Sequence, residues 1–143
     1  MRTAPPIGRF VIVPLLLLPA AALGASFDGA YTGTLACPAF PGQQPLHAAI
    51  TVNVAGRDAT YEQVGTPGGA AAGDLGANEA GSGSVSPSGD IVLTGGCRGG
   101  FSCATEYRGN LGTAPIRLKG AQRWWFRSGE RERTCDVELT RSK

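Results

Sequence analysis

The chain has 143 residues, and its 13 basic and 11 acidic side chains give a formal net charge of +2. Two of the basic residues, Arg2 and Arg9, lie within residues 1–25, so the remainder of the chain has no net charge. This balance argues against a general electrostatic affinity for nucleic acid, which needs a surplus of basic side chains. We therefore expect no nucleic-acid partner.

Residues 1–25 have the three-part order of a secretory signal peptide. Arg2 and Arg9 precede an apolar stretch from Phe10 to Leu18, and small residues from Ala20 to Ala25 supply a cleavage site after Gly24 or Ala25. A membrane-spanning helix needs about 20 apolar residues, whereas the stretch from Phe10 to Ala25 has sixteen and is interrupted by Pro14, Pro19 and Gly24. We predict that residues 1–25 are removed and that no membrane anchor remains. The product is then exported and works in the periplasm or outside the cell.

Residues 26–143 are predicted to form a single all-β domain. Apolar and polar residues alternate in short runs, separated by Gly, Pro, Asn and Asp, and no segment shows a sustained helical period. The best hairpin signal is the turn Ser86–Gly89, and Gly120 is expected to bend the chain between two short strands. In chain order the expected strands are 31–37, 48–54, 60–64, 83–85, 90–94, 102–109, 116–119, 122–126 and 135–139.

Two segments are expected to lie outside strands. Residues 65–78 are rich in Gly and Ala and predict a mobile loop. Residues 127–133 form a polar tip, in which Glu130 and Glu132 alternate with Arg131 and Arg133 and indicate a solvated loop with weak local ion pairs.

The spacing of the strands predicts an antiparallel meander of eight or nine short strands. Such a meander forms a small closed or nearly closed barrel, or alternatively a β-sandwich. Cys37 and Cys135 share inward faces with Leu35 and Val137, in the first and last strands. This placement favours closure between those two strands, and therefore the barrel.

Four cysteines in an exported domain predict two disulfides. Three pairings are possible, and we favour Cys37–Cys135, which joins the first and last strands, together with Cys97–Cys103, which spans a tight turn. No Cys-x-x-Cys pair is present and His47 is the single histidine, so we predict no metal site, no thiol redox chemistry and no cofactor.

The sequence contains no specific catalytic arrangement. A nucleophilic triad would have to use His47, whose neighbours indicate the start of a strand, and a surface histidine is the simpler interpretation. We therefore predict no catalytic residues, and we favour a non-enzymatic protein.

One surface constellation stands out. Strand alternation places Arg117, Lys119, Arg123 and Trp125 on one face, with Leu118, Gln122, Trp124 and Phe126 on the other, and Arg127 follows. An exposed tryptophan among cations suits contact with an acidic polymer, a small ligand or an envelope protein. The simpler alternative is a tryptophan covered by arginine stems.

Several short motifs carry a resemblance to other proteins. Phe27-Asp28-Gly29-x-Tyr31-x-Gly33, the hairpin at 83–95, Gln122-Arg123-Trp124 and Cys135-x-x-x-Leu139 resemble a group of uncharacterised small exported bacterial β-rich proteins. At the level of architecture the chain is also similar to avidin-like and lipocalin-like barrels and to small barrel inhibitors of the bacterial envelope. These motifs imply a fold and no particular activity.

Three functional hypotheses follow. The first is an exported non-enzymatic binding module that uses the mouth of the barrel or the face that carries Trp125. The second is an inhibitor of an envelope or foreign hydrolase that works through residues 65–78 or 127–133. The third is an enzyme of unknown type, which would need a second polar group within about 3 Å of His47 or of a paired acid.

Overall fold

The computed structural model describes Met1 and residues 26–64, 78–98 and 102–143. The predicted signal peptide and residues 65–77 of the predicted mobile loop lie outside the described residues. No helix long and apolar enough to cross a membrane occurs within the described ranges.

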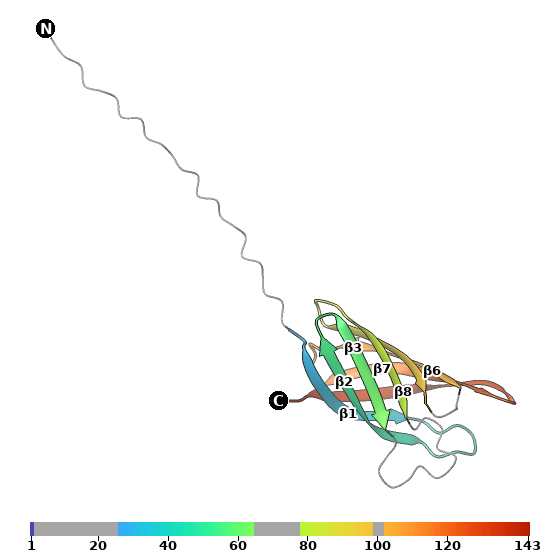
Figure 1. Ribbon diagram of the computed structural model, residues 1–143. Coiled ribbons are helices and arrows are strands. Elements are labelled where there is room, and N and C mark those ends of the chain that lie inside the picture. The colour runs from blue at the N-terminus through green and yellow to red at the C-terminus, as the bar shows by residue number, and fades with distance from the viewer. Residues whose placement is uncertain (2–25, 65–77, 99–101) are drawn as a thin grey trace.

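Eight antiparallel strands form a closed barrel in which each strand pairs with the next, and the last pairs with the first (Figure 1). This arrangement confirms the predicted meander barrel and rules out the alternative sandwich. The strands are β1 (Gly29–Cys37), β2 (Leu46–Ala55), β3 (Asp58–Val64), β4 (Glu79–Val85), β5 (Asp90–Cys97), β6 (Cys103–Asn110), β7 (Ile116–Phe126) and β8 (Gly129–Arg141).

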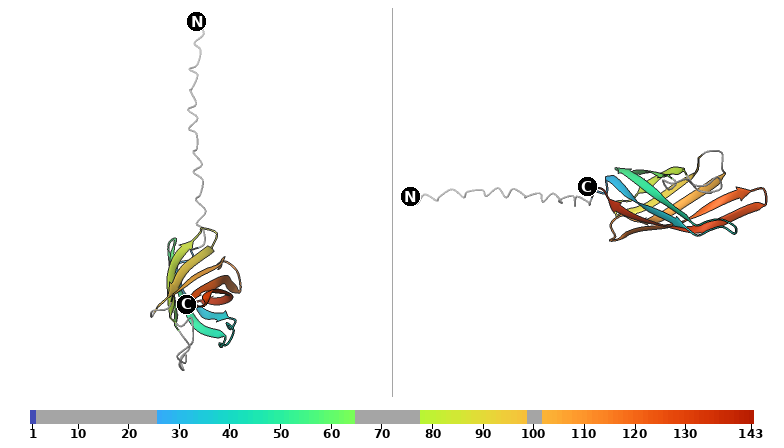
Figure 2. Two further views of the ribbon diagram at one scale, coloured as in Figure 1. Left: turned by 90° about the vertical axis from the view of Figure 1, so that its right-hand side faces the viewer. Right: turned by 90° about the horizontal axis from the view of Figure 1, so that it is seen from below.

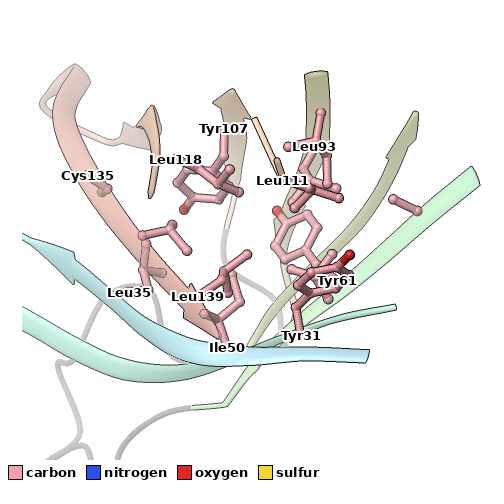
Figure 3. Packing of buried hydrophobic residues seen from close by; sticks show 14 of the residues in the cluster. Tyr31, Leu35, Ile50, Tyr61, Leu93, Tyr107, Leu111, Leu118, Cys135 and Leu139 are labelled. Atoms are coloured by element: carbon pink, nitrogen blue, oxygen red, sulfur yellow. The ribbon is translucent and has the colours of Figure 1, made fainter. Parts of the chain in front are cut away.

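The barrel interior is filled by side chains that alternate inward along every strand. An eight-stranded barrel leaves an interior just wide enough for such filling. Burying one large apolar side chain contributes about 1.5–3 kcal/mol, so this core supplies most of the driving force for folding. Figure 3 shows the packing, with Tyr31, Leu35, Ile50, Leu93 and Leu118 among the residues that are almost completely buried.

Two of the expected boundaries are wrong. Gly120 does not separate two strands, because β7 runs without interruption from Ile116 to Phe126. A Cβ atom at Gly120 would lie 1.8 Å from the carbonyl oxygen of Glu106, so the glycine is required by the close approach of β6. The predicted polar loop 127–133 is instead mostly strand, because β8 begins at Gly129 and Arg133 faces the interior.

Both predicted disulfides are present. Cys37 and Cys135 join β1 to β8 with a Cα–Cα distance of 4.3 Å, and Cys97 and Cys103 join β5 to β6 with a Cα–Cα distance of 5.3 Å. Disulfides form and persist in oxidising compartments. The two bridges are therefore consistent with export from the cytoplasm.

The two ends of the barrel differ. In an antiparallel meander the connections alternate between ends, so the connection 38–45 and the β7–β8 turn share one end, while the turns at 56–57, 86–89 and 111–115 share the other. At the second end, the Tyr31 hydroxyl donates to the Phe27 carbonyl at 2.7 Å, and Phe27 packs against the core. The first end carries the residues considered below.

Candidate functional site

The β7–β8 hairpin extends beyond the rest of the barrel (Figure 2). Pairing of β7 with β6 ends at Trp124, opposite Cys103, and pairing of β8 with β1 begins only at Asp136, opposite Ala36. Residues 125–134 therefore lie past the last pairs that close the barrel on either side. We call residues 125–134 the projecting hairpin.

Trp125 lies on the outer face of the projecting hairpin. Its side chain is 46% exposed, and within the described residues it is the only large hydrophobic residue classed as exposed besides Met1. Its backbone N–H donates to the Ser102 carbonyl at 3.2 Å, which attaches the base of the hairpin to the start of β6. A large aromatic ring is thus held in solvent by a backbone with a defined position.

The strand residues of the predicted contact face lie together on the outer wall. Arg117, Lys119, Arg123 and Trp125 all point outward from β7, as the alternation predicts, while Leu118, Gln122 and Trp124 point inward. Arg127 is exposed in the turn at the tip of the hairpin, beyond the end of β7. The structure therefore groups four of the five residues on one strand face and places the fifth at its end.

Acidic residues of β8 face these cations. Arg123 contacts Glu130 at 2.9 Å and Glu132 at 3.0 Å, and Arg117 contacts Glu138 at 3.4 Å. Lys119 lies opposite Asp136 in the register, and both line a shallow groove on the outer wall. The three basic residues of this strand face thus have four acidic neighbours, so the face has no surplus positive charge to attract an acidic polymer.

Aromatic contacts brace the inner face of the projecting hairpin. Trp124 stacks on Phe126 with ring centroids 6.1 Å apart, and the Phe40 ring meets Phe126 edge-on at 6.0 Å. The Arg133 guanidinium lies 4.7 Å from the centroid of Phe40, and its Nη1 donates to the Pro38 carbonyl at 3.1 Å. The connection 38–45 therefore supports the hairpin from beneath.

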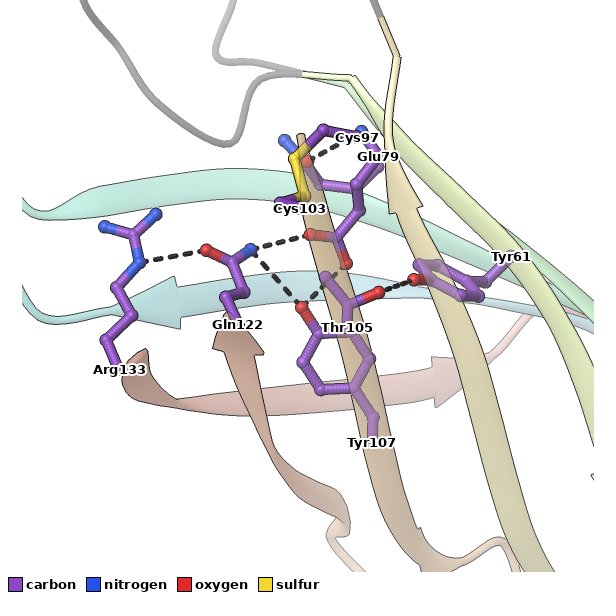
Figure 4. Close-up of a disulfide and its surroundings, with 9 residues drawn as sticks. Tyr61, Glu79, Cys97, Cys103, Thr105, Tyr107, Gln122 and Arg133 are labelled. Carbon is purple, nitrogen blue, oxygen red and sulfur yellow. Dashed lines mark hydrogen bonds between the residues drawn. A yellow bond between two sulfur atoms is a disulfide. The ribbon is translucent and has the colours of Figure 1, made fainter. Parts of the chain in front are cut away.

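A polar cluster lies inside the barrel close to the Cys97–Cys103 bridge (Figure 4). The Glu79 carboxylate accepts hydrogen bonds from the Tyr107 hydroxyl and from Gln122 Nε2, each at 2.6 Å. The Gln122 carbonyl in turn accepts from Arg133 Nε at 2.9 Å. Gln63 Oε1 accepts from the Glu79 backbone N–H at 3.2 Å. The side-chain amide of Gln122 thus links the buried Arg133 to the buried Glu79.

Burial determines the electrostatics of this cluster. Desolvation raises the pKa of Glu79, and hydrogen bonds from Tyr107 and Gln122 together with the charge of Arg133 oppose that rise. Desolvation and the neighbouring carboxylate also raise the pKa of Tyr107. Both side chains are fully buried and contact no solvent. This arrangement suits a structural network and offers a substrate no contact in this structure.

His47 lies on the outer face of β2, opposite Ala36 of β1, and is exposed. No hydrogen bond of its side chain is found among the described residues, so the geometry lends the predicted catalytic alternative no support. Within the same residues, no group of three or more His, Cys, Asp or Glu side chains is arranged to hold a metal ion.

Most of the interior polar cluster does not follow from the sequence-based expectations. Gln122 is expected on the inward face, but Arg133 is expected in a solvated tip, and no role is expected for Glu79. A signal was present, because Arg133 is two residues before the inward Cys135, and Gln63 is two residues after the buried Tyr61. In a strand such spacing places side chains on one face.

Comparisons with protein-family models, with curated proteins and with solved structures yield no match for this chain. The resemblance to small exported bacterial proteins therefore stays a prediction.

Proposed function

We propose that this chain is an exported, non-enzymatic binding module that contacts an envelope protein in the periplasm or outside the cell. The observation that carries the proposal is the exposed Trp125 ring on the projecting hairpin. Tryptophan is among the residues that dominate binding energy at protein interfaces, where it fills a pocket of the partner. Exposing this ring has no evident benefit for folding.

The supports of the hairpin favour binding to a folded partner. The Cys37–Cys135 bridge at its base, the Phe40–Phe126 contact beneath it and the ion pairs of Arg123 all restrict its motion. A surface ordered before binding loses less conformational entropy when the complex forms. The balanced charges of the same face make a protein with mixed charges a better partner than a polyanion.

Inhibition of a hydrolase is a second candidate function. Arg127 and Ser128, at the tip of the hairpin, are exposed and lie beyond the last paired residues of β1 and β6. A narrow, braced hairpin has the shape needed to enter the cleft of an enzyme. In this case the captured partner would be a hydrolase that loses activity in the complex.

Affinity capture from an envelope extract tests the proposal. The immobilised wild-type protein is compared with Trp125→Ala and with Thr60→Ala, a control on the exposed face of β3. Loss of an interface hot spot costs at least about 2 kcal/mol, so we expect Trp125→Ala to bind the captured protein about 30-fold more weakly. Thr60→Ala should bind as the wild type does. Cooperative urea unfolding with a wild-type midpoint checks that both variants keep the native packing, and equal capture by a folded Trp125→Ala protein would overturn the proposal.

A further inference from the structure

One strand edge of the projecting hairpin has no partner strand among the described residues. β1 ends at Cys37, which is bridged to Cys135, and Phe40 of the following connection lies against Phe126 and Arg133 on the inner face of the hairpin. Residues 129–134 of β8 consequently pair with β7 on one side and with no described strand on the other. An unpaired edge of this kind presents backbone donors and acceptors to another chain.

The alternation of hydrogen bonds along the β7–β8 pair identifies which backbone groups of β8 point away from β7. In an antiparallel pair, every second residue bonds the neighbouring strand with its backbone N–H and C=O groups, and the residues between direct these groups to the opposite side. The two-residue turn makes Phe126 and Gly129 the first bonded pair, so Glu130, Glu132 and Thr134 direct their backbone groups away from β7. Two observed bonds agree with this alternation, since Trp125 N–H donates to β6 outside the hairpin and Ser142 N–H donates to Ala30 of β1.

The connection 38–45 does not pair with this edge. Phe40 is buried beneath the inner face of the hairpin, between Phe126 and Arg133, and the contact from Pro38 goes to the Arg133 side chain. No backbone hydrogen bond among the described residues joins this connection to Glu130, Glu132 or Thr134.

The charge pattern of the edge opposes pairing with a second copy. Glu130 and Glu132 lie on the outer face, and Arg131 and Arg133 lie on the inner face. Two copies paired antiparallel about a two-fold axis would place outer face beside outer face, so glutamates would oppose glutamates and arginines would oppose arginines. Like charges directly opposite each other destabilise a strand pair.

We propose that an extended segment of a partner protein adds to the free edge of β8 as an antiparallel strand. Basic side chains of that segment face Glu130 and Glu132, which among the described residues both contact the same cation, Arg123. The backbone groups of Glu130, Glu132 and Thr134 supply the hydrogen bonds, as in other cases of strand addition. This inference rests on the proposed function, because it names how the partner of the same hairpin binds.

Synthetic peptides test the inference directly. The probe is an eight-residue peptide in which Arg alternates with Thr, and the controls are its Glu–Thr counterpart and an Arg–Thr peptide N-methylated at alternate residues. Binding to the full chain is followed by titration calorimetry. We expect the Arg–Thr peptide to bind and the other two to bind at least 10-fold more weakly. Failure of the Arg–Thr peptide to bind, or equal binding of its N-methylated form, would overturn the inference.

A matched pair of variants separates backbone from charge. The Glu132 N–H points away from β7, so Glu132→Pro removes an edge donor and leaves the β7–β8 ladder intact. Glu132→Ala removes the same charge and keeps the N–H. We expect Glu132→Pro to weaken peptide binding at least 10-fold and Glu132→Ala to weaken it less. Equal loss in both variants would refute strand addition.

Two further measurements distinguish strand addition by a partner from self-association and from binding through Trp125 alone. Sizing chromatography tests self-association, and a wild-type dimer that Glu132→Pro converts to a monomer would show that a second copy occupies the edge, against the proposal. In the capture experiment, loss with Trp125→Ala but not with Glu132→Pro supports the proposed function and rejects the strand-addition mode.

Discussion

Glu79 shows how an acidic side chain is accommodated in a core made largely of apolar side chains. Its carboxylate has a donor on each oxygen, and Arg133 lies one amide further along the same chain of hydrogen bonds. Burying a carboxylate is costly unless it is paired and hydrogen-bonded. Arg133 and Gln122 therefore make this position tolerable for an acid.

We expect Glu79→Gln to change the pH dependence of stability. Because burial raises the folded-state pKa of Glu79, its contribution is fully present below the ordinary pKa of a glutamate and is lost as pH rises through the folded-state value. Relative to Glu79→Gln, the wild type should lose up to about 1.4 kcal/mol of unfolding free energy per pH unit within that window. Urea denaturation at pH 4, 6 and 8 measures the difference. A constant difference would show that the carboxylate is not perturbed.

At the scale of the element, β7 and β8 form one long hairpin. Ion pairs stabilise its outer face, and stacked aromatic rings stabilise its inner face. Arg123 bonds the acids of β8 on the outer face, while Trp124 and Phe126 stack on the inner face. Gly120 lets the middle of β7 approach β6 closely enough for the ladder to continue.

Gly120→Ala should destabilise the protein although Ala is the smallest substitution. The added Cβ would lie 1.8 Å from the Glu106 carbonyl oxygen and 2.6 Å from the Tyr107 ring, so the strands must separate locally. Overpacking of this kind costs about 1–3 kcal/mol. Ala121→Ser, at the next position on the outer face, is the control and should change stability by less than about 0.5 kcal/mol. Equal unfolding midpoints for the two variants would contradict the close contact.

At the scale of the whole molecule, closure depends on the seam between the first and last strands. β1 and β8 pair over only six residues, from Tyr31 to Ala36 on the β1 side, and the Cys37–Cys135 bridge stands at the end of that ladder. The bridge links residues 98 apart in sequence, whereas Cys97 and Cys103 are only 6 apart.

The two bridges should differ in their contributions to stability. In the chain-entropy account, a bridge across about 100 residues contributes about 4–5 kcal/mol, and one across a short turn contributes about 2 kcal/mol. We therefore expect the double variant Cys37→Ala/Cys135→Ala to lose more unfolding free energy than Cys97→Ala/Cys103→Ala. Urea titrations of both variants under one set of conditions provide the comparison. A larger loss in the second variant would show that local packing outweighs the chain entropy.

Much of the fold could be predicted from the sequence because strand alternation is a local signal. Ala48, Ile50, Val52 and Val54 repeat every second residue, which is enough to identify a strand and its inward face. The cysteine spacing supplied the long-range information that closed the barrel, since Cys37 and Cys135 face inward on the first and last strands.

The tertiary structure decided what local alternation could not. Whether Arg133 is solvated or buried depends on Gln122 and Phe40, which are distant in sequence and meet it only when β7, β8 and the 38–45 connection pack together. The edge of β8 that no described strand pairs with has a similar origin. β1 ends at Cys37, whereas its neighbour β8 begins at Gly129, beyond the point that β1 reaches. The sequence by itself therefore determined most of the strands, their inward faces and the disulfides, because these follow from spacing along the chain. Only the folded barrel decided which charges are buried and which backbone groups stay free, because both depend on how far neighbouring strands extend.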